Sequence, residues 1–192
     1  MSRLLRILGS WSLYLGLVFA PICPSSGAIA ETTKSPIPGH VKQIDGYPFP
    51  GEIAGLRRGQ KSDYGTPGLG FSVRYEKPGE TWADIFIYDL GETQNFTDSR
   101  KASDQRDTAL GDIDRAVSSG SYQMAKLIAK KESAPFAKAH VAITQNGKTR
   151  DSFVFVTIHK GNFVKIRLTT TADNPGRLAD RFASDYSRLL GK

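Results

Sequence analysis

Residues 139–171 read AHVAITQNGKTRDSFVFVTIHKGNFVKIRLTTT, and this stretch predicts three antiparallel strands joined by two tight turns. Asn146 and Gly147 lie between two alternating, β-branched runs, which favours a two-residue type I′ turn because both turn positions need a positive φ. This turn places Gln145 opposite Lys148. The register then puts the aliphatic residues of both strands on one face: Val141, Ile143, Val154, Val156 and Ile158.

The second turn contains Lys160, Gly161 and Asn162. A two-residue loop of Gly161 and Asn162 would place Lys165 and Arg167 beside valine and isoleucine and bury their charges. A three-residue loop avoids this burial. It pairs Ile158 with Val164, Val156 with Ile166 and Val154 with Leu168, and so predicts one continuous aliphatic face.

The opposite face of these strands carries the candidate binding residues. We expect Phe155 and His159 there on the middle strand, with Lys165 and Arg167 beside them. This aromatic and basic surface is a candidate platform for a ligand or a partner. In the alternative interpretation, Phe153 and Phe155 are core residues under a second layer, while the two cations lie along the edge with their charged ends in water.

The first 30 residues have the pattern of a secretory signal peptide. Arg3 and Arg6 precede an apolar run over 11–20, and small residues follow up to Ala30. We expect cleavage after Ala30 and a periplasmic or secreted protein. The apolar run is short for a membrane span and no second one follows, so no transmembrane segment is expected after cleavage. Residues 20–22 fit a lipid-attachment site at Cys23 poorly.

The mature chain would keep 162 of the 192 residues, enough for a single domain. Removing Arg3 and Arg6 from the 26 basic side chains leaves 24 against 19 acidic ones, a net charge of +5. This charge favours an anionic envelope component or an acidic protein as partner. Export argues against nucleic acid. The only cysteine leaves with the signal, so no disulfide is expected.

The rest of the mature chain predicts an α+β fold. Residues 31–50 contain four prolines and are expected to form an exposed, extended lead-in to a domain over 51–192. Residues 70–76 and 81–88 form a second hairpin, and a helix starts at Ser103. Residues 122–131 fit a strand or a helix, and we favour a strand. An amphipathic helix from Pro175 closes the chain and is expected on the aliphatic face. Together these elements predict an antiparallel sheet of about six to seven strands, in two hairpin or meander groups, flanked by helices.

Little in the sequence indicates catalysis. No HExxH, CxxC or GxSxG motif occurs, and we expect neither a metal nor another cofactor. Asp84 lies in an apolar strand, where its pKa would be raised unless it is paired, and pairing with an arginine is the simpler interpretation. Asp151 is diagonal to His140 in the predicted register. A hydrolase acting on a cell-envelope component, with Asp84 or this pair as acid and base, is therefore the alternative to a non-catalytic binding protein.

The order of these elements resembles the PsbP-like α/β/α sandwich of lumenal and periplasmic accessory proteins. The phrases WADIFIYDLG (82–91) and GNFVKIRLTTT (161–171) are similar to those of uncharacterised bacterial secreted proteins. The resemblance covers most of 50–190 and implies a binding or accessory role without a cofactor. It carries over no functional residues.

Overall fold

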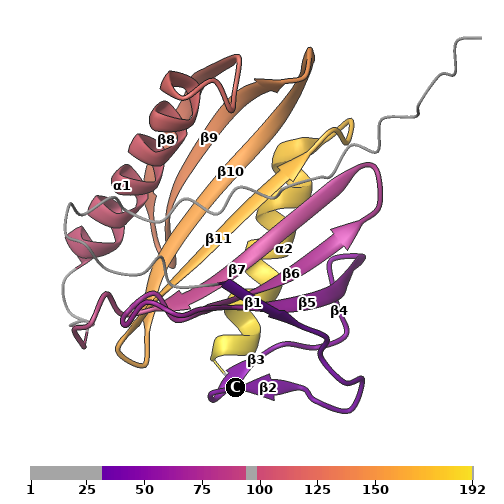
Figure 1. Cartoon of the computed structure of the whole chain (residues 1–192), viewed down its shortest axis with the longest axis vertical. Coiled ribbons are helices and arrows are strands. Elements are labelled where there is room, and N and C mark those ends of the chain that lie inside the picture. The colour runs from indigo at the N-terminus through magenta and orange to yellow at the C-terminus, as the bar shows by residue number, and fades with distance from the viewer. Residues whose placement is uncertain (1–31, 94–98, 192) are drawn as a thin grey trace, which may run out of the picture.

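The structure is a computed structural model that describes residues 32–93 and 99–191. These residues form a nine-stranded antiparallel sheet, a two-stranded sheet and two helices (Figure 1). The strands are β1 (Thr32–Ser35), β2 (Gln43–Ile44), β3 (Tyr47–Pro48), β4 (Glu52–Ile53), β5 (Leu56–Tyr64), β6 (Phe71–Lys77), β7 (Thr81–Tyr88), β8 (Met124–Ser133), β9 (Phe136–Gln145), β10 (Lys148–His159) and β11 (Asn162–Thr170). The helices are α1 (Ser99–Ser118) and α2 (Pro175–Leu190).

The large sheet has the order β1-β5-β6-β7-β11-β10-β9-β8, and β4 pairs with β5. The α+β class is confirmed, but the sheet has more than the six to seven strands expected. The additional strands lie in the polar segment 32–64, where β5 reads LRRGQKSDY and shows no alternation of apolar and polar residues. Residues 124–133 form a strand, as favoured from the sequence.

The β9–β10 hairpin has the predicted register, with Gln145 opposite Lys148. Its two turn residues, Asn146 and Gly147, have φ of 51° and 71°, as a type I′ turn requires. The β6–β7 hairpin is also confirmed, and Glu80 N–H donates to Lys77 O across its turn at 3.2 Å.

The predicted three-residue turn between β10 and β11 is wrong. The loop has two residues, Lys160 and Gly161, with φ of 50° and 77°, and His159 pairs with Asn162. The lysine itself adopts the left-handed conformation, and its Nζ donates to Gly46 O at 3.1 Å. The one-residue difference turns β11 over relative to the prediction. Val156 therefore pairs with Lys165, and Val154 pairs with Arg167. On the other face, Phe155 pairs with Ile166, and Phe153 pairs with Leu168.

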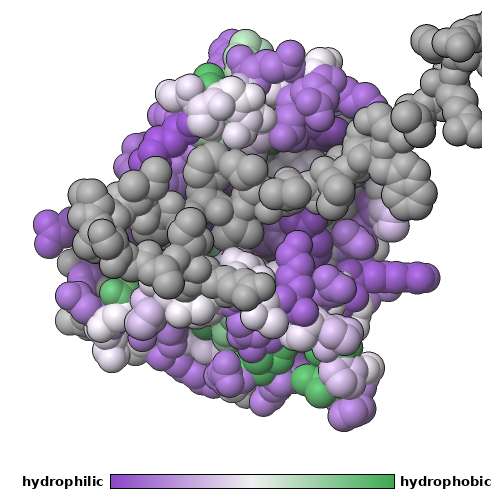
Figure 2. All heavy atoms as spheres, in the orientation of Figure 1, coloured by the Kyte–Doolittle hydropathy of each residue, from purple (hydrophilic) through white to green (hydrophobic). Residues whose placement is uncertain are grey.

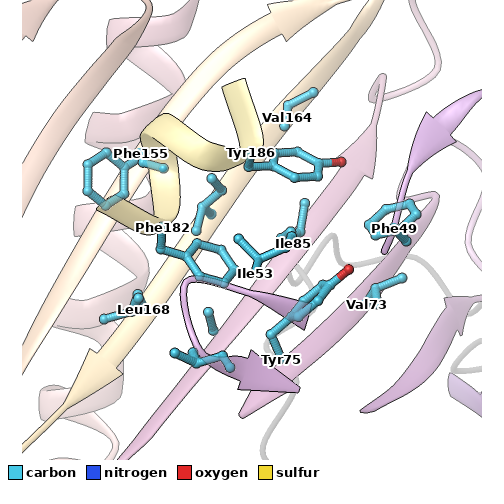
Figure 3. Close-up of a cluster of buried hydrophobic side chains, with 14 of the residues drawn as sticks. Phe49, Ile53, Val73, Tyr75, Ile85, Phe155, Val164, Leu168, Phe182 and Tyr186 are labelled. Atoms are coloured by element: carbon cyan, nitrogen blue, oxygen red, sulfur yellow. The ribbon is translucent and has the colours of Figure 1, made fainter. Parts of the chain in front are cut away.

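The two helices cover opposite faces of the sheet (Figure 1). We call the face that packs on α2 the α2 face. Its core includes Phe153 and Ile166. Figure 3 labels further members of this core: Val73, Tyr75, Ile85, Phe155, Val164 and Leu168. We call the other face the α1 face; its core includes Val141, Ile143, Val154, Val156 and Phe163. The expectation that the closing helix would cover the aliphatic Val154 and Val156 is wrong. Phe182 and Tyr186 of α2, both fully buried, pack instead among the aromatic residues of the α2 face (Figure 3).

The prolines of the lead-in suggested an exposed segment, and Lys34 is exposed, but the end of the segment is buried. Tyr47 is 3% exposed and Phe49 is fully buried in the core against α2. Strand β1 pairs with β5. The Arg58 guanidinium binds carbonyl oxygens of this segment, that of Pro38 at 3.0 Å and also that of Phe49. Residues 32–50 are therefore part of the folded unit.

The predicted signal peptide lies outside the described residues. Neither α1 nor α2 is long and apolar enough to cross a membrane. In the view of Figure 2, the described residues over α1 and the upper end of the sheet are mainly hydrophilic, with hydrophobic colour in small separate patches.

Candidate functional site

The four residues of the predicted platform do not share a face. Phe155 is 3% exposed and lies in the α2-face core, so the alternative interpretation of Phe153 and Phe155 as core is confirmed. His159 ends β10, where its ring contacts the Tyr47 ring and its carbonyl accepts the Tyr47 hydroxyl at 2.7 Å. Lys165 and Arg167 point to the opposite, α1 face, because the turn has two residues and not three.

Lys165 lies on an aromatic surface of the α1 face. Its Nζ is 4.6 Å from the centre of the Phe86 ring and 5.3 Å from that of Tyr88, both on the neighbouring strand β7. Burial lowers the pKa of the Lys165 ammonium to about 8; the charge of Asp112 on α1 partly opposes this shift, and that of Arg167 adds to it. Within the described chain, Lys165 forms no ion pair with a carboxylate.

Arg167 lies two residues further along β11, on the same face. Its guanidinium donates to the Tyr122 hydroxyl at 2.9 Å and lies 5.9 Å from that ring. Asp84 on the neighbouring strand β7 pairs with Arg167 in the sheet. Its carboxylate, however, already accepts two hydrogen bonds from Arg74, of 2.9 and 2.8 Å. The charge of Arg167 therefore has no carboxylate partner of its own in the described residues.

A third cation completes this surface. Arg150 of β10 lies 5.6 Å from the Trp82 ring. We use the name cationic patch for these three cations together with the aromatic rings next to them. Its residues are Arg150, Lys165, Arg167, Trp82, Phe86, Tyr88 and Tyr122. Aromatic faces hold the cations in place without neutralising their charge. The patch is thus suited to binding an anion.

The sequence contained a signal for these rings. In WADIFIYD every second residue of β7, from Trp82 to Tyr88, lies on one face, and Phe86 is opposite Lys165 in the sheet. That pairing could not be read from the sequence, because β7 and β11 are brought together by tertiary structure across about 80 residues of chain.

The carboxylates considered for catalysis have structural partners. Asp84 forms the ion pair with Arg74 that the simpler interpretation expected. His140 Nε2 lies 2.6 Å from Asp151 Oδ1, so this predicted pair is present, and the imidazole stacks on Phe153 with 4.2 Å between ring centres. His140 borders a hollow of about 200 Å³. The residues lining this hollow include no serine, threonine or cysteine: Ala129, Lys131, Lys138, His140, Phe153 and Gly176.

The described residues contain no cluster of three or more histidine, cysteine, aspartate or glutamate side chains that could hold a metal ion.

One solved structure resembles this chain in the order and arrangement of its elements. The solution structure of cyanobacterial PsbP (CyanoP) from Synechocystis sp. PCC 6803 matches with a TM-score of 0.45 and 16% sequence identity, over 87% of this chain and 95% of that one. This chain is similar to PsbP at that level. No family model and no curated protein sequence matches it. The PsbP similarity agrees with the order of elements noted in the sequence and does not extend to function.

Proposed function

We propose that the protein is an exported, non-catalytic binding or accessory protein whose cationic patch binds an anionic component of the cell envelope. The observation that carries this proposal is the environment of Lys165, a half-buried lysine on two aromatic rings with no carboxylate partner in the described chain. The signal-peptide pattern of residues 1–30 supports export.

A buried charge without a partner destabilises the folded state. An apolar residue at position 165 would pack on Phe86 and Tyr88 without this cost. A lysine there has a clear advantage only if its charge is used, and an arriving anion would supply the missing partner. Arg167, two residues along the same strand, adds a second cation for the same ligand.

The ligand chemistry follows from the donors. Lys165 is a point charge with three donors, while Arg150 and Arg167 offer planar guanidinium groups that bind carboxylates and phosphates with two hydrogen bonds. Phosphate head groups of lipids and carboxylates of acidic polysaccharides both fit this chemistry, and the experiment separates them.

The test uses the mature chain and two probes: vesicles that contain phosphatidylglycerol, and polygalacturonate. We expect binding to one of them, weakened on the order of tenfold or more in the double variant Lys165→Gln, Arg167→Gln. Lys34→Gln is the matched control, because Lys34 is an exposed lysine on β1, at the far edge of the sheet. Undiminished binding by the double variant, or equal weakening by the control, would show that the patch is not the site.

The alternative function, a hydrolase of an envelope component, is favoured by a single observation, the His140–Asp151 pair beside a hollow. The same polygalacturonate incubation addresses it. We expect the polymer length to stay constant. Shortening of the chains by the unmodified protein and not by His140→Ala would favour the hydrolase.

A further inference from the structure

Strand β8 ends the large sheet beside α1, and β9 is its only neighbour among the described strands (Figure 1). It is ten residues long, whereas β1 at the other edge has four. An edge strand of this length presents backbone N–H and C=O groups to any further strand that approaches. Proteins usually keep such edges short or covered.

The side chains of β8 are unusual for a free edge. Four large hydrophobic side chains of the described chain are about half exposed, and three of them lie on β8: Met124 at 50%, Leu127 at 51% and Ile128 at 49%. Most of β8 is exposed, although Arg106 of α1 donates to Lys131 O at 3.3 Å near the end of the strand. The three exposed apolar residues therefore add little to the packing of the strand. Exposed apolar residues gathered on one element are typical of an interaction site.

The same strand is basic, because it carries three lysines and one acidic residue, Glu132, which forms an ion pair with Arg106 of α1. Lys126, Lys130 and Lys131 are exposed on it, and only Lys130 has a carboxylate partner in the described chain, Asp107 at 2.9 Å. If a second copy of β8 paired antiparallel with the first, the lysines of the two copies would lie close together and their charges would repel. The charge therefore disfavours self-pairing and favours an acidic strand.

A hollow adjoins the edge on the α2 face. The hollow of about 200 Å³ reaches from Ala129 and Lys131 on β8 to Lys138 on β9, with Phe153 among its lining residues. Lys138 Nζ lies 5.5 Å from the Phe153 ring. A side chain of an added strand next to Ala129 would face a cavity with an aromatic wall and cations at its rim.

We propose that β8 is a docking edge for an extended, acidic segment of a partner protein, which adds to the sheet as a further strand. Backbone hydrogen bonds to β8 hold the segment, its carboxylates lie near Lys126 and Lys131, and its apolar side chains contact Leu127 and Ile128. The irregularity between Leu127 and Ala129 in β8 interrupts regular pairing, so the added strand pairs on one side of it or contains a matching irregularity. This edge shares no residue with the cationic patch, although Tyr122 of the patch lies two residues before β8.

The test uses a fluorescent ten-residue peptide that alternates glutamate and valine, and a control peptide that alternates lysine and valine. We expect the acidic peptide alone to bind, with slowed amide hydrogen exchange confined to 124–133. The double variant Lys126→Glu, Lys131→Glu should weaken binding by about tenfold or more, while Lys34→Glu on the opposite edge has no effect. The variant pair at 165 and 167 should also leave peptide binding unchanged, which separates this proposal from the proposed function.

Three results would overturn the proposal. Equal binding of both peptides would mean a purely apolar contact. Protection of amides elsewhere than in β8 would place the site elsewhere. Sedimentation of the protein as a dimer that Leu127→Glu converts to a monomer would identify a second copy of the chain as the occupant.

Discussion

At the scale of single residues, Lys165 shows how a charge is kept inside a sheet face. Its ammonium rests on Phe86 and Tyr88 with no carboxylate partner in the described chain, and burial lowers its pKa to about 8. Because charges are costly to bury, a register that buries Lys165 and Arg167 is not expected from the sequence. Aromatic faces reduce that cost, and these rings come from a strand that is distant in the sequence.

We predict that Lys165→Met stabilises the protein by about 1 kcal/mol at pH 7, because the charge is no longer desolvated while the apolar contact with Phe86 remains. The folded-state pKa lies below the ordinary value of 10.5, so the unfolded chain binds more protons between pH 8 and 10.5. The unfavourable contribution of Lys165 is thus fully present below pH 8 and disappears as the pH rises. Urea unfolding of both proteins at pH 7 and 9 measures this.

The pH dependence provides the check on this prediction. The advantage of the methionine variant should shrink at pH 9, because the lysine of the unmodified protein has by then lost much of its charge. If the methionine variant were less stable than the unmodified protein at pH 7, the ammonium would be holding the fold together, which would also contradict the argument for the cationic patch.

At the scale of elements, the close approach of the loop before β6 to β7 depends on one glycine. Gly70 has φ of +59°, and a Cβ there would lie 2.0 Å from Ile87 O. Gly79, in the turn between β6 and β7, has φ of +77° but nothing within 4 Å of its Cβ position. The two positions share the backbone requirement and differ in the space around them.

We predict that Gly70→Ala destabilises the protein by more than about 3 kcal/mol, because the backbone of β7 must move in addition to the left-handed strain. Gly79→Ala is the matched control and should cost only about 1 kcal/mol. Thermal or urea unfolding compares them. Equal losses would show that the contact with Ile87 is relieved without cost.

Turns and registers at this scale divide into those that local sequence determines and those that it does not. Asn146 and Gly147 specify a two-residue type I′ turn, and the β9–β10 register that follows from it was predicted correctly. For Lys160, Gly161 and Asn162 the local sequence allowed several loops. The loop that forms makes two hydrogen bonds to the distant lead-in. Lys160 Nζ donates to Gly46 O, and Asn162 Nδ2 donates to Tyr47 OH at 3.0 Å.

At the scale of the whole molecule, the end of the segment 32–50 contributes Tyr47 and Phe49 to the core. A chain that starts at residue 51 would lose the buried Tyr47 and Phe49 and the carbonyl partners of Arg58. We predict a loss of at least about 3 kcal/mol in the free energy of unfolding, since removing one buried aromatic side chain typically costs this much. Urea unfolding of the chains starting at 31 and 51 tests this. Equal stability would restore the interpretation of 31–50 as a separate lead-in.

Local sequence was sufficient to predict the α+β class, both hairpins with strong turn signals, the amphipathic closing helix, an arginine partner for Asp84 and the His140–Asp151 pair. For 122–131 the sequence fitted a strand or a helix, and the strand that was favoured forms over 124–133. These features depend on neighbouring residues or on one turn, so alternation, spacing and turn chemistry are sufficient to identify them.

The tertiary structure was needed to show which face each helix covers, that Lys165 and Arg167 lie opposite Phe155 and His159, and that Tyr47 and Phe49 of the lead-in are buried. Each of these depends on segments that meet from distant parts of the chain. In a sheet, a shift of one residue exchanges the two faces of a strand, so one turn that local sequence leaves open decides where every later side chain points.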